Sequence, residues 1–136
     1  MTRALITGGT GFVGSNIALR LAERHWDVRI LQRPGSSLEL LEGGPFEFVT
    51  GDVLQPETLP PALCGVDVIF HAAGVVDYWR QGTDRMYQVN VEGTRNVMEA
   101  ALRSGIERVV HTSSTAAMGI HPNVLVDETF TFNVKP

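Results

Sequence analysis

Three glycines near the start of the chain, Gly9, Gly11 and Gly14, have the spacing G-x-G-x-x-G. Strand-like residues 3–7 precede them, and an apolar pattern of helical period follows at once. A turn of this kind aims backbone N–H groups and the positive end of a helix at an anion, which favours a dinucleotide pyrophosphate. We expect Gly9 to permit the tight turn, Gly11 to admit the pyrophosphate, and Gly14 to let the helix pack closely against the strand. A glycine-rich surface turn is the alternative.

Polar residues after the next predicted strands suit the adenosine end of such a ligand. Gln32 and Arg33 stand about 20 residues past the glycines, where an acidic residue that binds the adenine ribose would be expected. A guanidinium there suits a 2′-phosphate, which favours NADP, with NAD as the alternative. A solvated strand-end charge is the alternative for Arg33. Asp52 is placed to accept from the adenine amino group, or else it caps a turn.

Small residues follow the fourth predicted strand, in the segment 71–74. Larger side chains there would collide with the dinucleotide; tight packing beneath the loop is the alternative reason for small residues. Asn90 lies on the apolar stripe of a predicted helix, and Gly93 one turn later permits close backbone approach. Because a buried Asn must be hydrogen-bonded, we expect Asn90 to brace strand four or five; a cofactor contact is the alternative. Tyr78 and Trp79 are candidates to line a substrate pocket, or to pack under a loop.

These residues fall between elements whose patterns alternate between strand and helix. Strands are predicted at 3–7, 27–33, 46–50, 66–70 and 108–112, and helices at 12–25 and 84–104, with a short helix at 37–42. Residues 56–63 are expected to be helical only briefly, because Pro60-Pro61 would break the helix. The alternation predicts one α/β domain over 1–136, with a doubly wound parallel sheet of order 3-2-1-4-5.

Composition limits the partners. A net charge of −4 gives no electrostatic reason to bind DNA, RNA or anionic lipid. The single cysteine, Cys64, excludes an internal disulfide. The apolar stretch 66–76 is interrupted by Asp67 and His71 and cannot span a bilayer, so we expect a cytoplasmic protein. The four histidines and one cysteine lack ligand-like spacing, and no metal site is predicted.

Taken together, segments 7–14, 51–52, 71–74, 90–94 and 112–119 resemble the extended short-chain dehydrogenase/reductase family, also described as NAD-dependent epimerase/dehydratases. Arg33 makes the chain more similar to the dihydroflavonol-reductase and hydroxysteroid-dehydrogenase branch. The resemblance implies a Rossmann fold and a small-molecule substrate. The predicted cofactor contacts are Thr7, Gly8, Gly9, Gly11, Phe12, Val13, Gly14, Arg33, Asp52, Val53, His71, Ala72, Ala73, Gly74, Asn90 and Thr112.

The resemblance also implies a hydroxyl after strand five that hydrogen-bonds the reacting oxygen. Counting back from Gly119 assigns this catalytic role to Ser114. A strand-end hydroxyl that satisfies backbone groups is the alternative, and it suits Thr112 and Ser113 better. Met118 stands where the epimerases commonly have Tyr, so the substrate side stays open.

The family's Tyr-x-x-x-Lys pair, which supplies the general acid/base, is absent from the chain. Tyr78 is followed by Gly82 and Tyr87 by Val91. We therefore expect the N-terminal part of a longer enzyme, or a truncated gene product, without the C-terminal part of the family fold. Alone, it should bind dinucleotide and turn over nothing, because hydride transfer to a carbonyl needs a positioned proton donor.

The leading functional interpretation is part of an NAD(P)-dependent oxidoreductase that reduces a carbonyl or oxidises a secondary alcohol. A sugar-nucleotide epimerase or dehydratase is one alternative, and a non-catalytic NADPH-sensing module is another. In the family, the long helix packs beside the helix that carries the Tyr and Lys. We therefore expect 84–104 to expose an apolar strip and the chain to form a homo-oligomer through it.

Overall fold

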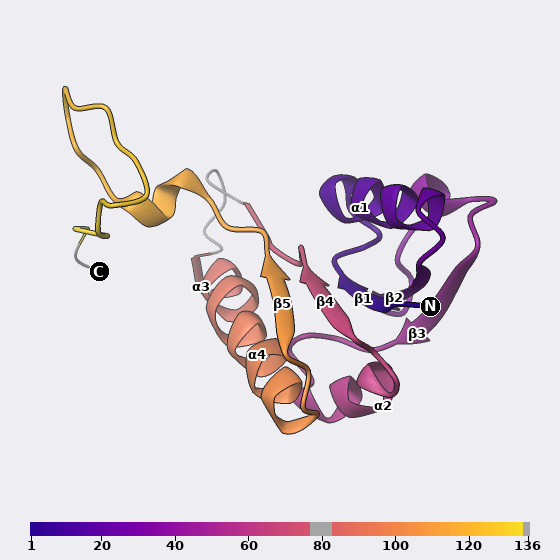
Figure 1. Ribbon diagram of the computed structural model, residues 1–136. Helices are drawn as coiled ribbons and strands as arrows, with labels where there is room; N and C mark the ends of the chain where they lie inside the picture. Colours follow the sequence, from indigo (N-terminus) through magenta and orange to yellow (C-terminus); the bar gives the residue numbers. More distant parts are fainter. Residues whose placement is uncertain (77–82, 135–136) are drawn as a thin grey trace.

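The computed structural model describes residues 1–76 and 83–134 (Figure 1). Within them, a five-stranded sheet has the order β3-β2-β1-β4-β5, and every neighbouring pair is parallel. The predicted α/β class and strand order are therefore confirmed. The strands are β1 (Arg3–Thr7), β2 (Asp27–Gln32), β3 (Phe46–Thr50), β4 (Val68–His71) and β5 (Arg108–His111).

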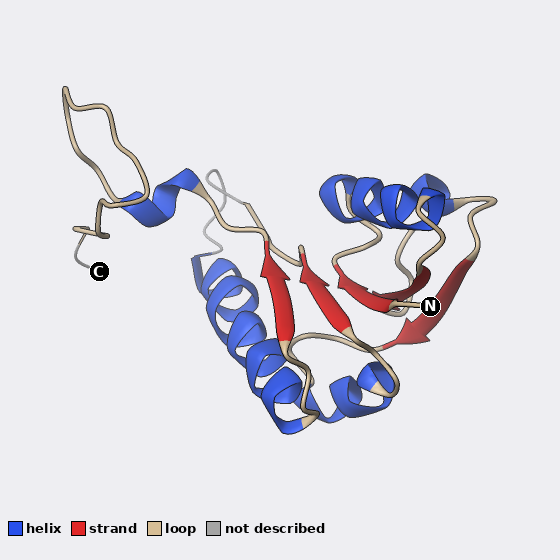
Figure 2. Cartoon of the chain, in the orientation of Figure 1, coloured by secondary structure: helices blue, strands red, loops and turns tan. Residues whose placement is uncertain are grey.

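Helices lie on both faces of this sheet. Figure 2 shows α1 on one face and α2 and α4 on the other. A π-helical turn at Gln88–Gly93 joins α3 to α4. The α-helices are α1 (Phe12–Glu23), α2 (Leu59–Leu63), α3 (Thr83–Tyr87) and α4 (Thr94–Arg103).

The central strand β1 contributes to two hydrophobic clusters, because successive side chains of a strand point to opposite faces. Ala4 and Ile6 pack on the face of α1, with Ala18 and Leu21. Leu5 packs on the opposite face, in the cluster formed with α2 and α4. The near-continuous apolar run of β1 is thus required by burial on both sides.

Arg29 is a buried charge that ties β2 to α2. Its Nη1 donates to the main-chain oxygens of Ala62 and Cys64, at 2.7 and 2.8 Å. These carbonyls lie at the C-terminal end of α2, where helix geometry leaves them without an intrahelical partner. Nε lies 3.0 Å from a carboxylate oxygen of Glu47, as an ion pair without an aligned hydrogen bond.

Three helical predictions differ at least in part from the structure. The α-helix in residues 56–63 is brief as predicted, since α2 has five residues, but Pro60 and Pro61 do not break it. They lie in its first turn, where a missing N–H costs no hydrogen bond. The long helix predicted at 84–104 is interrupted by the π turn, where a Cβ on Gly93 would lie 2.7 Å from the Val53 side chain. The predicted short helix at 37–42 is a single 3₁₀ turn, Glu39–Leu41.

Beyond β5 the chain leaves the sheet and projects away from it (Figure 1). A 3₁₀ turn at Thr115–Met118 begins this segment. The Asn133 side chain then bonds both main-chain groups of Ile120, each at 2.9 Å, and closes a loop between them. No strand forms in this segment as far as residue 134.

The expected apolar stripe of the long helix is partly covered and partly exposed. Val97, Ala100 and Ala101 are buried against the sheet. Tyr87 and Leu102 are 56% and 81% exposed. The homo-oligomer stays a prediction.

The face of the sheet beside α1 is also open over β4. An apolar groove of about 490 Å³ runs between α1 and this strand. Phe12, Val13, Ile17 and Phe70 line it, together with Arg24. None of the helices in residues 1–76 and 83–134 has the length and apolar character that crossing a membrane would need.

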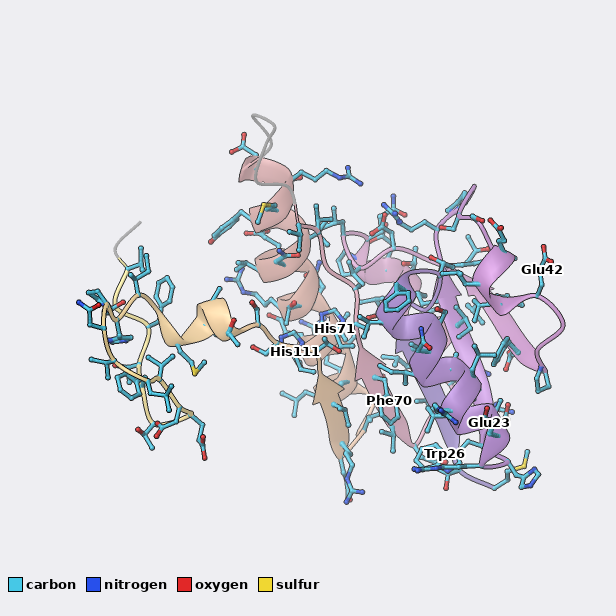
Figure 3. All side chains as sticks on the ribbon, turned by 90° about the horizontal axis from the view of Figure 1, so that it is seen from above. Glu23, Trp26, Glu42, Phe70, His71 and His111 are labelled. Carbon is cyan, nitrogen blue, oxygen red and sulfur yellow. The ribbon has the colours of Figure 1, made fainter. Side chains whose placement is uncertain are left out.

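His71 is a fully buried polar residue at the end of β4, and it lies beside His111 of β5 (Figure 3). The two rings stack with their centroids 5.2 Å apart. Burial, and then the neighbouring His111, lower the pKa of His71 to about 4. The folded chain therefore holds this ring neutral at pH 7.

We expect His71 to make the fold less stable in acid. The unfolded chain protonates His71 near 6.5 and the folded chain only near 4. The contribution of His71 to the free energy of unfolding is therefore fully present above pH 6.5. This contribution falls by about 3 kcal/mol on acidification to pH 4. Urea unfolding followed by circular dichroism across this range measures the loss.

The matched variants are His71→Gln, which cannot titrate, and His25→Asn. His25 is exposed and has a φ of 60°, a conformation that Asn tolerates. His71→Gln should flatten the pH dependence, and His25→Asn should keep it. An equal slope for wild type and His71→Gln would contradict the assignment.

Candidate functional site

A cleft of about 190 Å³ lies at the carboxyl ends of the central strands. Its walls come from the segments that follow β1, β2, β3 and β4. The predicted cofactor residues that line it are Gly8, Gly11, Arg33, Asp52, Val53, Ala72, Ala73 and Gly74. Residues predicted from four separate stretches of sequence thus meet at one hollow.

The tight turn after β1 falls on Gly8 rather than on Gly9. Gly8 has a φ of +68°, which favours glycine, and a Cβ there would lie 2.5 Å from the Ala73 nitrogen. Gly9 is constrained by a neighbouring strand, since its Cβ would lie 2.8 Å from the Ile30 side chain. The first glycine of the motif therefore serves packing, and the residue before it makes the turn.

Gly14 and Gly11 differ in what the fold requires of them. A Cβ on Gly14 would collide with the carbonyl oxygen of Gly8, so the first turn of α1 packs directly on the glycine turn. Gly11 has extended backbone, with φ −91° and ψ 172°. A Cβ there would meet only the Gly8 oxygen, at 3.4 Å. Packing within the chain thus requires glycine at 14 and leaves room for a side chain at 11.

The start of α1 carries free hydrogen-bonding capacity toward the cleft. Gly11 is the N-cap, no side chain caps the helix, and its first turn holds no acidic residue. The first N–H groups of a helix have no intrahelical partner and carry its positive end. Phe12 and Val13 do not line the cleft; their side chains line the groove on the other side of α1.

Arg33 lies just past β2 and lines the cleft with Ser36. Its side chain is exposed, and no carboxylate in the described part of the chain forms an ion pair with it. A guanidinium with five donors is therefore open to an anionic group at this end of the cleft.

Asp52 caps a turn and also lines the cleft, and its contact with an adenine amino group stays a prediction. Its Oδ1 accepts from the Leu54 N–H at 2.9 Å, and its own N–H donates to the Thr58 hydroxyl at 3.0 Å, so it does cap a turn. It also lines the cleft. The second carboxylate oxygen has no hydrogen bond to the residues described here, and it can accept one from a ligand.

Thr7, His71 and Asn90 do not line the cleft. Asn90 is exposed rather than buried as expected. Thr7 and His71 are buried and bond to each other at 2.6 Å. The Asn90 side chain bonds both main-chain groups of Val75 at 2.8 Å. Asn90 is thus a brace, and it holds the segment after β4 rather than a strand.

Thr112 and Ser114 lie past the end of β5 and outside the cleft lining. The Thr112 N–H donates to the main-chain oxygen of His71 at 2.9 Å. The Ser114 hydroxyl is exposed and accepts from the Ala116 N–H at 3.2 Å. Its hydrogen remains available to a ligand, although its oxygen already satisfies a backbone group.

Several lining residues were not predicted, namely Thr10, Leu31, Ser36, Gly51, Leu54, Val75 and Val89. Leu31 carried a usable signal, because it is the last buried residue of β2 and precedes Arg33 by two positions. Tyr78 and Trp79 lie outside the described residues. In the described part of the chain, no group of three His, Cys, Asp or Glu side chains could hold a metal ion.

Sequence comparison finds relatives for nearly the whole chain. The model of the 3-beta hydroxysteroid dehydrogenase/isomerase family matches residues 5–133. A 3-beta-hydroxysteroid dehydrogenase of Mycolicibacterium neoaurum is 36% identical over 98% of this chain and 38% of its own length. The chain therefore spans little more than a third of that curated relative.

Solved structures agree with the fold. The crystal structure of gox2253 superposes with a TM-score of 0.88 at 42% identity, over 98% of this chain and 41% of that one. A short-chain dehydrogenase/reductase superfamily protein from Agrobacterium tumefaciens, solved with bound NAD, gives 0.72 at 32% identity, over 85% and 34%. The chain belongs to the 3-beta hydroxysteroid dehydrogenase/isomerase family, within the extended short-chain dehydrogenases/reductases, and carries its nucleotide-binding part.

Proposed function

We propose that the cleft holds a nicotinamide dinucleotide, with its pyrophosphate over Gly11 and the first turn of α1. The observation that carries this proposal is the contrast between Gly11 and Gly14. The fold has no room for a side chain at Gly14 and does have room at Gly11. Glycine at 11 is explained if a ligand backbone occupies the space that a side chain would take. The uncapped helix start supplies the N–H donors for the phosphates.

The remaining walls fit the adenosine half. Leu31, Val53 and Val75 give apolar surface for a base, and the free oxygen of Asp52 accepts from its amino group. Arg33 and Ser36 offer donors at the ribose end. Charge-assisted bonds to a 2′-phosphate contribute about 1.5–3 kcal/mol each, so NADP is the favoured cofactor.

In the full protein this chain serves an oxidoreductase that acts on a carbonyl or a secondary alcohol. When bound, the cofactor supplies or accepts the hydride. Ser114 is the residue of this chain proposed to hold the reacting oxygen, because its hydroxyl hydrogen is free and it follows β5 at the cleft edge of the sheet. A proton donor must come from elsewhere in the protein.

Gly11→Ala tests the pyrophosphate position. The variant should fold, because its Cβ has room, while NADPH affinity falls by about tenfold or more through overlap with the ligand. NADPH fluorescence titration measures affinity, and thermal unfolding measures the fold. Gly14→Ala is the opposite control and should lower the melting temperature itself. Unchanged NADPH binding by Gly11→Ala would remove the basis of the proposal.

Arg33→Asp tests the choice of cofactor. NADPH binding should weaken roughly 10- to 100-fold, while NADH binding changes much less, because only NADPH carries the 2′-phosphate. Arg24→Asp makes the same change of charge in the groove behind α1, outside the cleft. It should leave the ratio of the two affinities at the wild-type value. If Arg33→Asp lowered the affinities for NADPH and NADH equally, Arg33 would not be binding a 2′-phosphate.

A further inference from the structure

His71 bonds to a hydroxyl on each side of its ring. Its Nδ1 lies 2.6 Å from Oγ1 of Thr7, the last residue of β1, and its Nε2 lies 2.9 Å from Oγ1 of Thr94, the first residue of α4. The ring is fully buried. One side chain of β4 therefore links three elements, and each of its nitrogens has a defined partner.

Thr94 fixes the direction of these hydrogen bonds. Its hydroxyl has one hydrogen, which it donates to the main-chain oxygen of Asn90 at 2.8 Å. Toward His71 it can only accept, so Nε2 carries the ring hydrogen. In the neutral ring Nδ1 is then the acceptor, and the Thr7 hydroxyl donates to it. The other tautomer would place two acceptors, Nε2 and Thr94 Oγ1, against each other in the protein interior.

The same chain continues into the cleft wall at both ends. Thr7 Oγ1 accepts from the Ala73 N–H at 3.4 Å. At the other end, Asn90 bonds Val75 through its side chain. Ala73 and Val75 are two residues apart in the chain, so the two ends of this hydrogen-bonded series are joined by the backbone of residues 73–75. We call the set Thr7, His71, Thr94, Asn90, Ala73 and Val75 the His71 network.

We propose that His71, as its Nε2–H tautomer, is a positioning residue for the bound dinucleotide. It orders the His71 network, which fixes residues 72–75 where they line the cleft. His71 itself touches no ligand, because it lies behind that wall. The proposal rests on the proposed function, since the wall affects affinity only if a dinucleotide lies against it. If His71 merely filled the core, loss of its hydrogen-bond partner would leave NADPH affinity unchanged.

The first test is nitrogen-15 NMR of the histidine side chains in the wild-type chain at pH 7. The chain has four histidines, and His71→Gln assigns the resonances of His71 by their loss. We expect Nε2 to be protonated and Nδ1 to be unprotonated, before and after NADPH is added. A protonated Nδ1, a charged ring, or a mixture of tautomers would overturn the proposal.

The second test changes the hydrogen-bond partner of the His71 side chain and leaves His71 in place. Thr94→Val removes the acceptor of Nε2–H at nearly constant volume, so His71 should shift toward the Nδ1–H tautomer. NADPH affinity should fall about tenfold. Thr94→Ser restores the hydroxyl and should restore both the tautomer and the affinity. Val97→Ala, a core truncation one turn along α4, serves as a control for destabilisation alone.

The results separate this proposal from the proposed function. If the wild-type chain binds neither NADPH nor NADH, the proposed function fails and the role of His71 fails with it. If the wild type binds NADPH and Thr94→Val binds it equally well, only the role of His71 is overturned. An affinity loss in Val97→Ala as large as that in Thr94→Val would also overturn it, because the loss would then follow stability.

Discussion

The cleft depends on how closely the backbone at Gly8 approaches two other stretches of backbone. On one side it meets the segment after β4, where a Cβ would lie 2.5 Å from the Ala73 nitrogen. On the other, its carbonyl oxygen occupies the space that a side chain at Gly14 would need. The end of β1, the wall after β4 and the start of α1 therefore meet without side chains between them. What faces the cleft at this point is main chain, which is suited to binding an anion through N–H groups.

Buried polar side chains hold the layers around this contact in register. Arg29 joins β2 to the end of α2 through two carbonyls, and His71 joins β1 and β4 to α4. Each lies on a strand but satisfies groups on a helix. Removing either would leave buried partners without a hydrogen bond, which costs more than the bond itself contributes. The helices on the far face of the sheet are thus fixed by specific bonds as well as by apolar packing.

The parts of the fold that could be predicted are those set by a single repeating pattern. The bounds of β3 match the prediction, and the strand order followed from the alternation of elements. The parts that could not be predicted depend on contacts with distant chain. The π turn at Gln88–Gly93 accompanies the close packing of Gly93 on Val53, and a search for a 3.6-residue period cannot detect it. The positive φ at Gly8 and the apolar walls at Val75 and Val89 likewise arise only once separate strands have come together.

The central position of β1 also has a consequence for biosynthesis. This strand leaves the ribosome before β4, which is one of its two neighbours, and Thr7 pairs with His71. More than sixty residues must be added before that edge of β1 acquires its hydrogen bonds. Until then an apolar strand presents unpaired N–H and C=O groups, a template for wrong pairing. Such non-local parallel pairing is slow to form. During translation, this edge of β1 therefore stays unpaired for a period set by the order of the strands in the chain.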